Sequence, residues 1–122
     1  MSVYNKEKPE YLDIALKSNL EDQTLRPDEM ILVCDGRLTE ELYSVIAKYE
    51  SKYSNTFRVF RLSENVGLGR ALCFGLEKCR YELIARSDSD DVCAPERFEI
   101  QTKFLEEHPE IDIVGSYIDE FN

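Results

Sequence analysis

The chain has 122 residues, a hydrophobic fraction of 43% and a formal net charge of −10. This length fits one domain over 1–122, and the apolar content suffices for a packed core, which excludes extensive disorder. The negative charge argues against a nucleic-acid partner, and no apolar run reaches the roughly 20 residues of a membrane span.

Strand and helix patterns alternate along the first half of the chain. A short strand is expected over 1–3, followed by a helix over 9–20 with Pro9 in its first turn. The run 30–34 is apolar throughout, which is typical of a strand buried on both faces. Apolar residues at helical spacing then predict a second helix over 42–53.

The same alternation continues in the second half. Strands are predicted over 57–62, 83–85 and 111–115, with a helix over 68–79 and another that opens at Pro95. Alternating strands and helices imply right-handed crossovers and parallel pairing. The predicted fold is therefore α/β, with a mostly parallel Rossmann-like sheet that carries helices on both faces.

Polar residues follow the predicted strands. Ligands of such sheets bind beyond the carboxyl ends of the strands, where this chain has Tyr4, Asp35 and Asn65. An aromatic ring can stack on a nucleobase, and Asp35 can accept a hydrogen bond from a base or a ribose. The alternatives are a tyrosine half-buried at a sheet edge and an ordinary Asp-Gly turn.

The acidic run after 83–85 is the most specific feature of the chain. Asp88, Asp90 and Asp91 lie within four residues, and like charges this close raise one another's pKa. Hard oxygen ligands suit Mg²⁺ or Mn²⁺, which would in turn hold an anion such as a diphosphate. The alternative is a solvated turn in which one aspartate caps the next helix.

Two arginines and two glycines flank this predicted edge. Arg70 and Arg86 could pair with a diphosphate or with the aspartates. Gly67 and Gly69 favour a tight entry into the helix over 68–79, because the dinucleotide and P-loop signatures are incomplete. The four cysteines show no metal-site spacing, which predicts a reduced, cytoplasmic protein without zinc.

Several short motifs together resemble family 2 glycosyltransferases, in the order and at the approximate spacing of that family. The motifs lie at 2–5, 23–24, 31–36, 65–67 and 88–91. The resemblance implies a GT-A fold whose amino-terminal half binds a nucleotide-diphosphate sugar, with a UDP-sugar favoured. The implied nucleotide-sugar-binding residues are Ser2, Tyr4, Asp35, Asn65, Asp88 and Asp90, and the implied Mg²⁺ or Mn²⁺ ligands are Asp90 and Asp91.

The resemblance also implies inverting transfer to a sugar or lipid-linked acceptor, in polysaccharide or glycan synthesis. Both ends suggest a piece of a longer protein, and the family's general base would lie beyond Asn122. We therefore expect no catalytic residue and no activity in 1–122 alone. The chain departs from the family at Cys34, where the family often has the first Asp of an Asp-Asp-Gly motif, and at Cys73, where Asn is common.

Two other functions stay open at this point. A nucleotidyltransferase would show a Gly-rich basic loop after the first strand, but 5–9 contains no glycine. A non-catalytic module could bind metal, nucleotide or a basic partner at its acidic edge. A place at the inner face of the membrane and association into a homo-oligomer are also left open.

Overall fold

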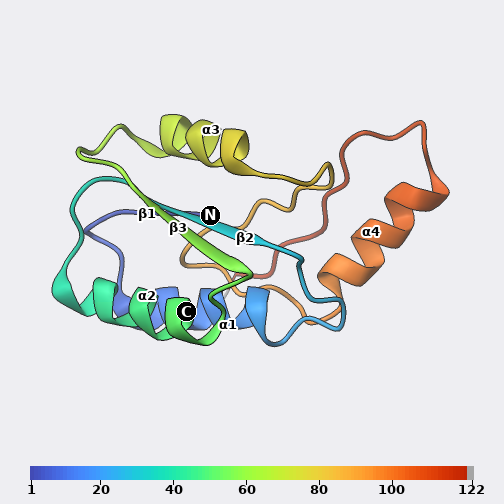
Figure 1. The fold of residues 1–122 in the computed structure, drawn as a ribbon. Helices are drawn as coiled ribbons and strands as arrows, with labels where there is room; N and C mark the ends of the chain where they lie inside the picture. Colours follow the sequence, from blue (N-terminus) through green and yellow to red (C-terminus); the bar gives the residue numbers. More distant parts are fainter. Residues whose placement is uncertain (121–122) are drawn as a thin grey trace.

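The computed structural model describes residues 1–120 and shows a three-stranded parallel sheet in the order β1-β2-β3 (Figure 1). Helices α1 and α2 cover one face of the sheet and α3 covers the other, as the alternating pattern predicted. The elements in chain order are β1 (Ser2–Val3), α1 (Pro9–Leu20), β2 (Met30–Cys34), α2 (Glu40–Lys52), β3 (Phe57–Arg61), α3 (Leu68–Lys78) and α4 (Arg97–Glu107).

The central strand β2 explains both faces of the core. Side chains alternate along a strand, so Met30, Leu32 and Cys34 join the core under α1 and α2. Ile31 and Val33 join the smaller core under α3. All five are buried, which confirms the prediction of a strand covered on both sides.

The register places three strand ends at one edge of the sheet. Val3 lies opposite Cys34, and Cys34 lies opposite Arg61 on β3. Helix α3 approaches closely, because a Cβ built on Gly75 would lie 3.1 Å from Cγ2 of Val33. The parallel pairing therefore brings the residues that follow β1, β2 and β3 together, as the pattern of polar strand ends required.

Local signals account for the starts of the helices. Pro9 occupies the first turn of α1, and the Thr39 hydroxyl accepts a hydrogen bond from the Leu42 amide at the start of α2. Gly67 precedes α3 with a φ of 91°, which favours glycine. Helix α4 begins at Arg97, slightly later than Pro95 suggested.

The strands predicted over 83–85 and 111–115 do not form. Leu83 is 57% exposed and Ile113 is 89% exposed, so neither apolar run is packed as a strand. The Val33 amide donates to the Met1 carbonyl and the Asp35 amide to the Val3 carbonyl. Alternate residues of a strand face opposite neighbours, so the two-residue β1 leaves one residue, Ser2, to pair with a further strand.

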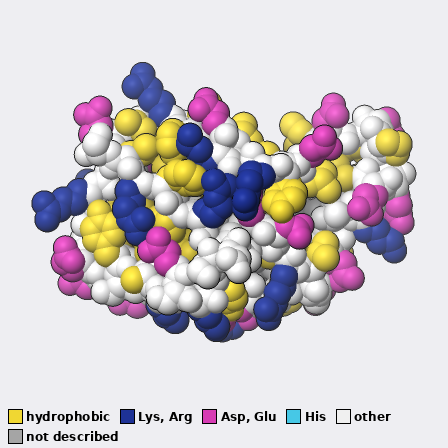
Figure 2. Space-filling view, in the orientation of Figure 1, with side chains coloured by type: hydrophobic (Ala, Val, Ile, Leu, Met, Phe, Trp, Pro, Cys, Tyr) yellow, Lys and Arg dark blue, Asp and Glu magenta, His cyan; other side chains and the backbone are white. Residues whose placement is uncertain are grey.

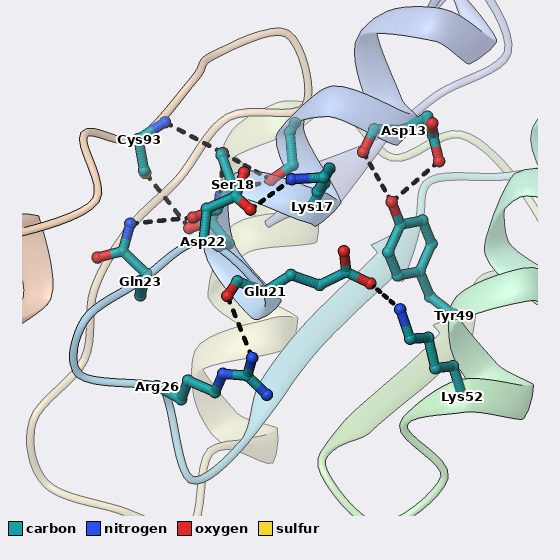
Figure 3. Close-up of polar contacts among 12 residues, drawn as sticks. Asp13, Lys17, Ser18, Glu21, Asp22, Gln23, Arg26, Tyr49, Lys52 and Cys93 are labelled. Atoms are coloured by element: carbon teal, nitrogen blue, oxygen red, sulfur yellow. Dashed lines mark hydrogen bonds and ion pairs between the residues drawn. The ribbon is translucent and has the colours of Figure 1, made fainter.

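Polar contacts fasten α1 to α2 (Figure 3). The Tyr49 hydroxyl donates to Oδ1 of Asp13 at 2.9 Å, and the Lys48 ammonium donates to the same oxygen at 2.8 Å. The hydrogen bond from Lys48 lowers the pKa of Asp13, while burial raises the pKa of Tyr49. These contacts fix the helix pair that supports β1 and β2. Within residues 1–120, none of the helices combines the length and the apolar character needed to cross a membrane.

Candidate functional site

A pocket of about 430 Å³ lies where the three strands end. Its lining comes from 4–6 after β1, from 35–37 after β2 and from Asn65 after β3. Three residues that were predicted separately, Tyr4, Asp35 and Asn65, therefore meet in one pocket. The parallel sheet brings them together, because each of them follows a strand at the same edge.

Asp35 is buried and holds the loop that leads into α3. Its Oδ1 accepts a hydrogen bond from the Val66 amide at 2.7 Å, and its Oδ2 accepts one from the Gly67 amide at 3.1 Å. The Asn65 side-chain amide donates to the Asp35 carbonyl at 3.3 Å. The hydrogen bonds between Asp35 and 65–67 were not predicted, because these residues lie about thirty positions apart in the sequence. Each carboxylate oxygen retains a further lone pair for a ligand.

Gly36 makes the close approach of the two loops feasible. Its φ of 84° lies in the left-handed region that favours glycine. A Cβ at this position would lie 2.7 Å from the backbone nitrogen of Asn65. The pocket wall therefore depends on the absence of a side chain at this turn.

Tyr4 and Ser2, two other residues predicted to contact a nucleotide, differ in their exposure to solvent. Tyr4 is 44% exposed at the pocket, which leaves its ring accessible to a ligand. Ser2 is buried within β1, opposite Val33, and is outside the set of residues that line the pocket.

The acidic run lies between α3 and α4, in a segment without helix or strand that turns at 89–90. The Arg86 guanidinium donates to Oδ1 of Asp88 at 3.3 Å. Of the two expected partners of Arg86, a diphosphate or an aspartate, this structure shows the aspartate. The Asp91 amide donates to the Asp88 carbonyl at 3.4 Å. Partial desolvation raises the pKa of the exposed Asp91, and the neighbouring carboxylates of Asp90 and Asp88 raise it further. This direction agrees with the repulsion expected of clustered aspartates.

A hydrogen bond links the acidic run to the turn that follows β1 and contributes to the pocket. The Ser89 hydroxyl is buried and donates to Oε2 of Glu7 at 2.6 Å. The Glu7 amide donates to the carbonyl of Tyr4, which lines the pocket. Glu7 was missed from the sequence because a charged residue in a polar turn resembles any solvated glutamate.

The donor set decides which kind of metal site the acidic run can form. Within residues 1–120, no group of three or more His, Cys, Asp or Glu side chains is arranged to hold a metal ion. Mg²⁺ is commonly bound by one or two carboxylates together with substrate phosphates and water. Asp90 and Asp91, both exposed, fit a metal shared with a diphosphate rather than one enclosed by protein.

Comparison with known proteins decides the family. The family model described as "Glycosyl transferase family 2" matches residues 1–122. The chain belongs to this family. The amylovoran biosynthesis glycosyltransferase AmsE of Erwinia amylovora is 44% identical over 122 residues, which are 100% of this chain and 45% of that protein. A UDP-Gal:alpha-D-GlcNAc-diphosphoundecaprenol beta-1,3-galactosyltransferase of Escherichia coli is 40% identical, over 99% of this chain and 43% of its own length.

A solved structure supports the same assignment. The crystal structure of S. aureus TarS matches this family 2 chain with a TM-score of 0.73 and 28% identity, over 88% of this chain and 19% of that chain. The fold is therefore α/β of the kind seen in this glycosyltransferase. This chain spans less than half the length of the two curated relatives.

Proposed function

We propose that this chain forms the donor-binding part of a glycosyltransferase that uses a nucleotide-diphosphate sugar. The meeting of Tyr4, Asp35 and Asn65 in one pocket carries this proposal, together with the family. A nucleobase fits beside the exposed ring of Tyr4, with the carboxylate of Asp35 as an acceptor. The same family argues against a nucleotidyltransferase or a non-catalytic module.

The acidic run takes the diphosphate side of the donor. We place ribose contact on Asp88 or Asp90, and Mg²⁺ or Mn²⁺ on Asp90 or Asp91. The carboxylate of Asp88 forms an ion pair with Arg86 in this structure. A contact between Asp88 and the ribose therefore requires this ion pair to open. The bond from Ser89 to Glu7 supports the proposal, because the Glu7 amide donates in turn to the carbonyl of Tyr4, which lines the pocket.

The proposed reaction is inverting transfer of the sugar to an acceptor hydroxyl. A general base deprotonates the hydroxyl, which attacks the anomeric carbon in line with the departing diphosphate. Asp90 or Asp91 would hold a divalent metal, which would supply positive charge to stabilise the negative charge that develops on this leaving group. The described residues orient the donor, and we place the general base outside 1–122. Sugar transfer by residues 1–122 alone would contradict this division of roles.

The relatives suggest the substrate class. By its name, the galactosyltransferase of Escherichia coli uses UDP-Gal and a sugar carried on diphosphoundecaprenol, and AmsE takes part in amylovoran biosynthesis. We extend this class to the present protein, with a UDP-sugar as donor and a sugar or lipid-linked sugar as acceptor. Its product would then be a bacterial-type polysaccharide or glycan.

Calorimetric titration of UDP into the full-length protein tests the donor site. UDP should bind more tightly with Mn²⁺ present, and Asp90→Ala should abolish this gain. Asp112→Ala removes another exposed aspartate, which follows α4 in the sequence and is not part of the acidic run, and should leave both titrations unchanged. The proposal would be contradicted if the affinity for UDP were the same with and without Mn²⁺. It would also be contradicted if the Asp90→Ala protein still bound UDP more tightly with Mn²⁺ present.

A further inference from the structure

The acidic run is closed into a loop by one side chain of α4. The Arg97 guanidinium donates to the Arg86 carbonyl at 2.8 Å and to the Ser87 hydroxyl at 3.1 Å. It also donates to the sulfur of Cys93 at 3.0 Å. Arg86 and Ser87 precede the aspartates, whereas Cys93 follows them. One guanidinium therefore joins the two ends of the segment that carries the acidic run.

The same segment is anchored to the end of α1. The Cys93 amide donates to the Ser18 hydroxyl at 3.1 Å, a contact drawn in Figure 3. The Ser87 hydroxyl donates to Oδ1 of Asn19 at 2.7 Å. Ser18, Asn19, Ser87 and Cys93 are all buried, so these hydrogen bonds are shielded from competing water.

A buried glutamine extends this anchor to α4. The Gln23 side-chain amide donates to the Ala94 carbonyl at 2.8 Å, and its Oε1 accepts from the Phe98 amide at 3.1 Å. Gln23, which belongs to the motif at 23–24, thus holds the segment that follows the acidic run. Together with Arg97, it fixes both the position of α4 and the position of the loop.

Regular secondary structure does not hold the acidic run in place. The chain between α3 and α4 contains neither a helix nor a strand, and α4 contains no buried residue. Backbone ladders and apolar packing therefore contribute little to the shape of the acidic run. The position of its carboxylates therefore depends on side-chain hydrogen bonds with α1, with α4, and with the turns that contain Glu7 and Gln23.

We propose that Arg97 is a positioning residue for the acidic run, acting through Arg86, Ser87 and Cys93 rather than on the ligand. The affinity part of this proposal rests on the proposed donor site. The planar guanidinium is essential to it, because several N–H groups must reach separate acceptors at once. The ammonium of a lysine is a compact point charge and cannot reproduce this geometry.

Two variants of the full-length protein separate geometry from charge. Arg97→Lys keeps the positive charge, and Arg97→Met keeps much of the apolar stem. Both should weaken Mn²⁺-dependent UDP binding by about tenfold or more, the size seen when a residue that orients metal ligands is lost. UDP binding without Mn²⁺ should stay unchanged, because the pocket at Tyr4 and Asp35 does not include Arg97.

Lys103→Met is the matched control. It removes one positive charge from the same helix at an exposed side chain, whose ion pair with Glu107 spans 3.9 Å. Its titrations should match those of the wild-type protein. Wild-type Mn²⁺ dependence in both Arg97 variants would overturn the proposal, as would full rescue by lysine, since charge alone would then suffice.

Amide hydrogen exchange tests the same proposal without any ligand. Arg97→Met should speed exchange of the Asp91 and Cys93 amides, which are hydrogen-bonded in the closed loop, but not of the Leu32 amide in β2. Unchanged exchange at Asp91 and Cys93 would overturn the positioning role. Faster exchange throughout the protein, Leu32 included, would also overturn it, because Arg97 would then act on global stability. If the wild-type protein did not bind UDP, but Arg97→Met still sped exchange at Asp91 and Cys93 alone, the donor site would be contradicted and the positioning role would stand.

Discussion

The two halves of the molecule are held together by different forces. Residues 1–78 contain all three strands of the described chain and nearly all of its buried apolar side chains. Within 79–120, the buried hydrophobic residue is Cys93, and polar side chains make most of the attachments. In the space-filling view, charged and apolar side chains are interspersed over the visible face (Figure 2).

This difference separates the two parts of the proposed donor site. The pocket at the ends of β1, β2 and β3 stands on a packed sheet, and its lining residues lie in the loops that follow these strands. The acidic run depends on hydrogen bonds that Arg97 and Gln23 donate and that Ser18 accepts from Cys93. We therefore expect changes in the core to unfold the protein, and changes in the polar network to loosen the acidic run while the pocket survives.

The largest contrast should come from truncating one leucine in each half. Leu32 is fully buried in the central strand, and Leu32→Ala should lower the free energy of unfolding by about 3 kcal/mol through lost burial and a cavity. Leu83 is 57% exposed, and Leu83→Ala should change it by less than about 0.5 kcal/mol. Urea unfolding of both variants measures the difference, and similar effects would refute the division into two halves.

A pair of glycines tests the pocket wall. Gly36→Ala should destabilise the fold by about 2 kcal/mol, because it combines strain at a φ of 84° with a contact against the Asn65 backbone. Gly69 lies in α3 with open space around a built Cβ, and Gly69→Ala should stabilise it by about 0.5 kcal/mol. Thermal unfolding checks both values. Equal tolerance of alanine at the two sites would show that the loops can separate freely.

The smallest of the three expected differences in stability concerns the junction between the halves. Glu29 accepts hydrogen bonds from Arg58 on β3 at 3.0 Å and from Arg80, just after α3, at 2.8 Å. Burial acts to raise the pKa of Glu29, but the hydrogen bonds from Arg80 and Arg58 outweigh it and hold the pKa below its ordinary value. Glu29→Gln should therefore lower stability by about 1 kcal/mol at pH 7.

The pH dependence of this effect has a definite sign. Because the folded pKa of Glu29 is depressed, its contribution is complete above the ordinary value of 4.5 and disappears as the pH falls through the folded pKa. The gap between wild type and Glu29→Gln should close over that acidic range. Denaturant unfolding at pH 7 and pH 3 measures it, and a gap that stays constant would contradict the assigned role.

The sequence by itself predicted the scaffold well because its signals are local. The apolar run 30–34 predicted a strand covered on both faces, and the helical spacing after Pro9 predicted α1. The same reasoning failed at 83–85 and 111–115, where apolar residues are exposed rather than paired. A strand requires a neighbour with free backbone groups, and the two-residue β1 offers few.

The sequence therefore determined the alternating α/β order, the polar residues at the strand ends and the resemblance to family 2 glycosyltransferases. The tertiary structure alone decided that the carboxylate of Asp35 binds the loop before α3 and that Arg97 closes the acidic run. Periodicity and motif spacing record contacts between near neighbours in the chain. A hydrogen bond between distant residues leaves no such period, so it becomes visible only when the folded chain brings its partners together.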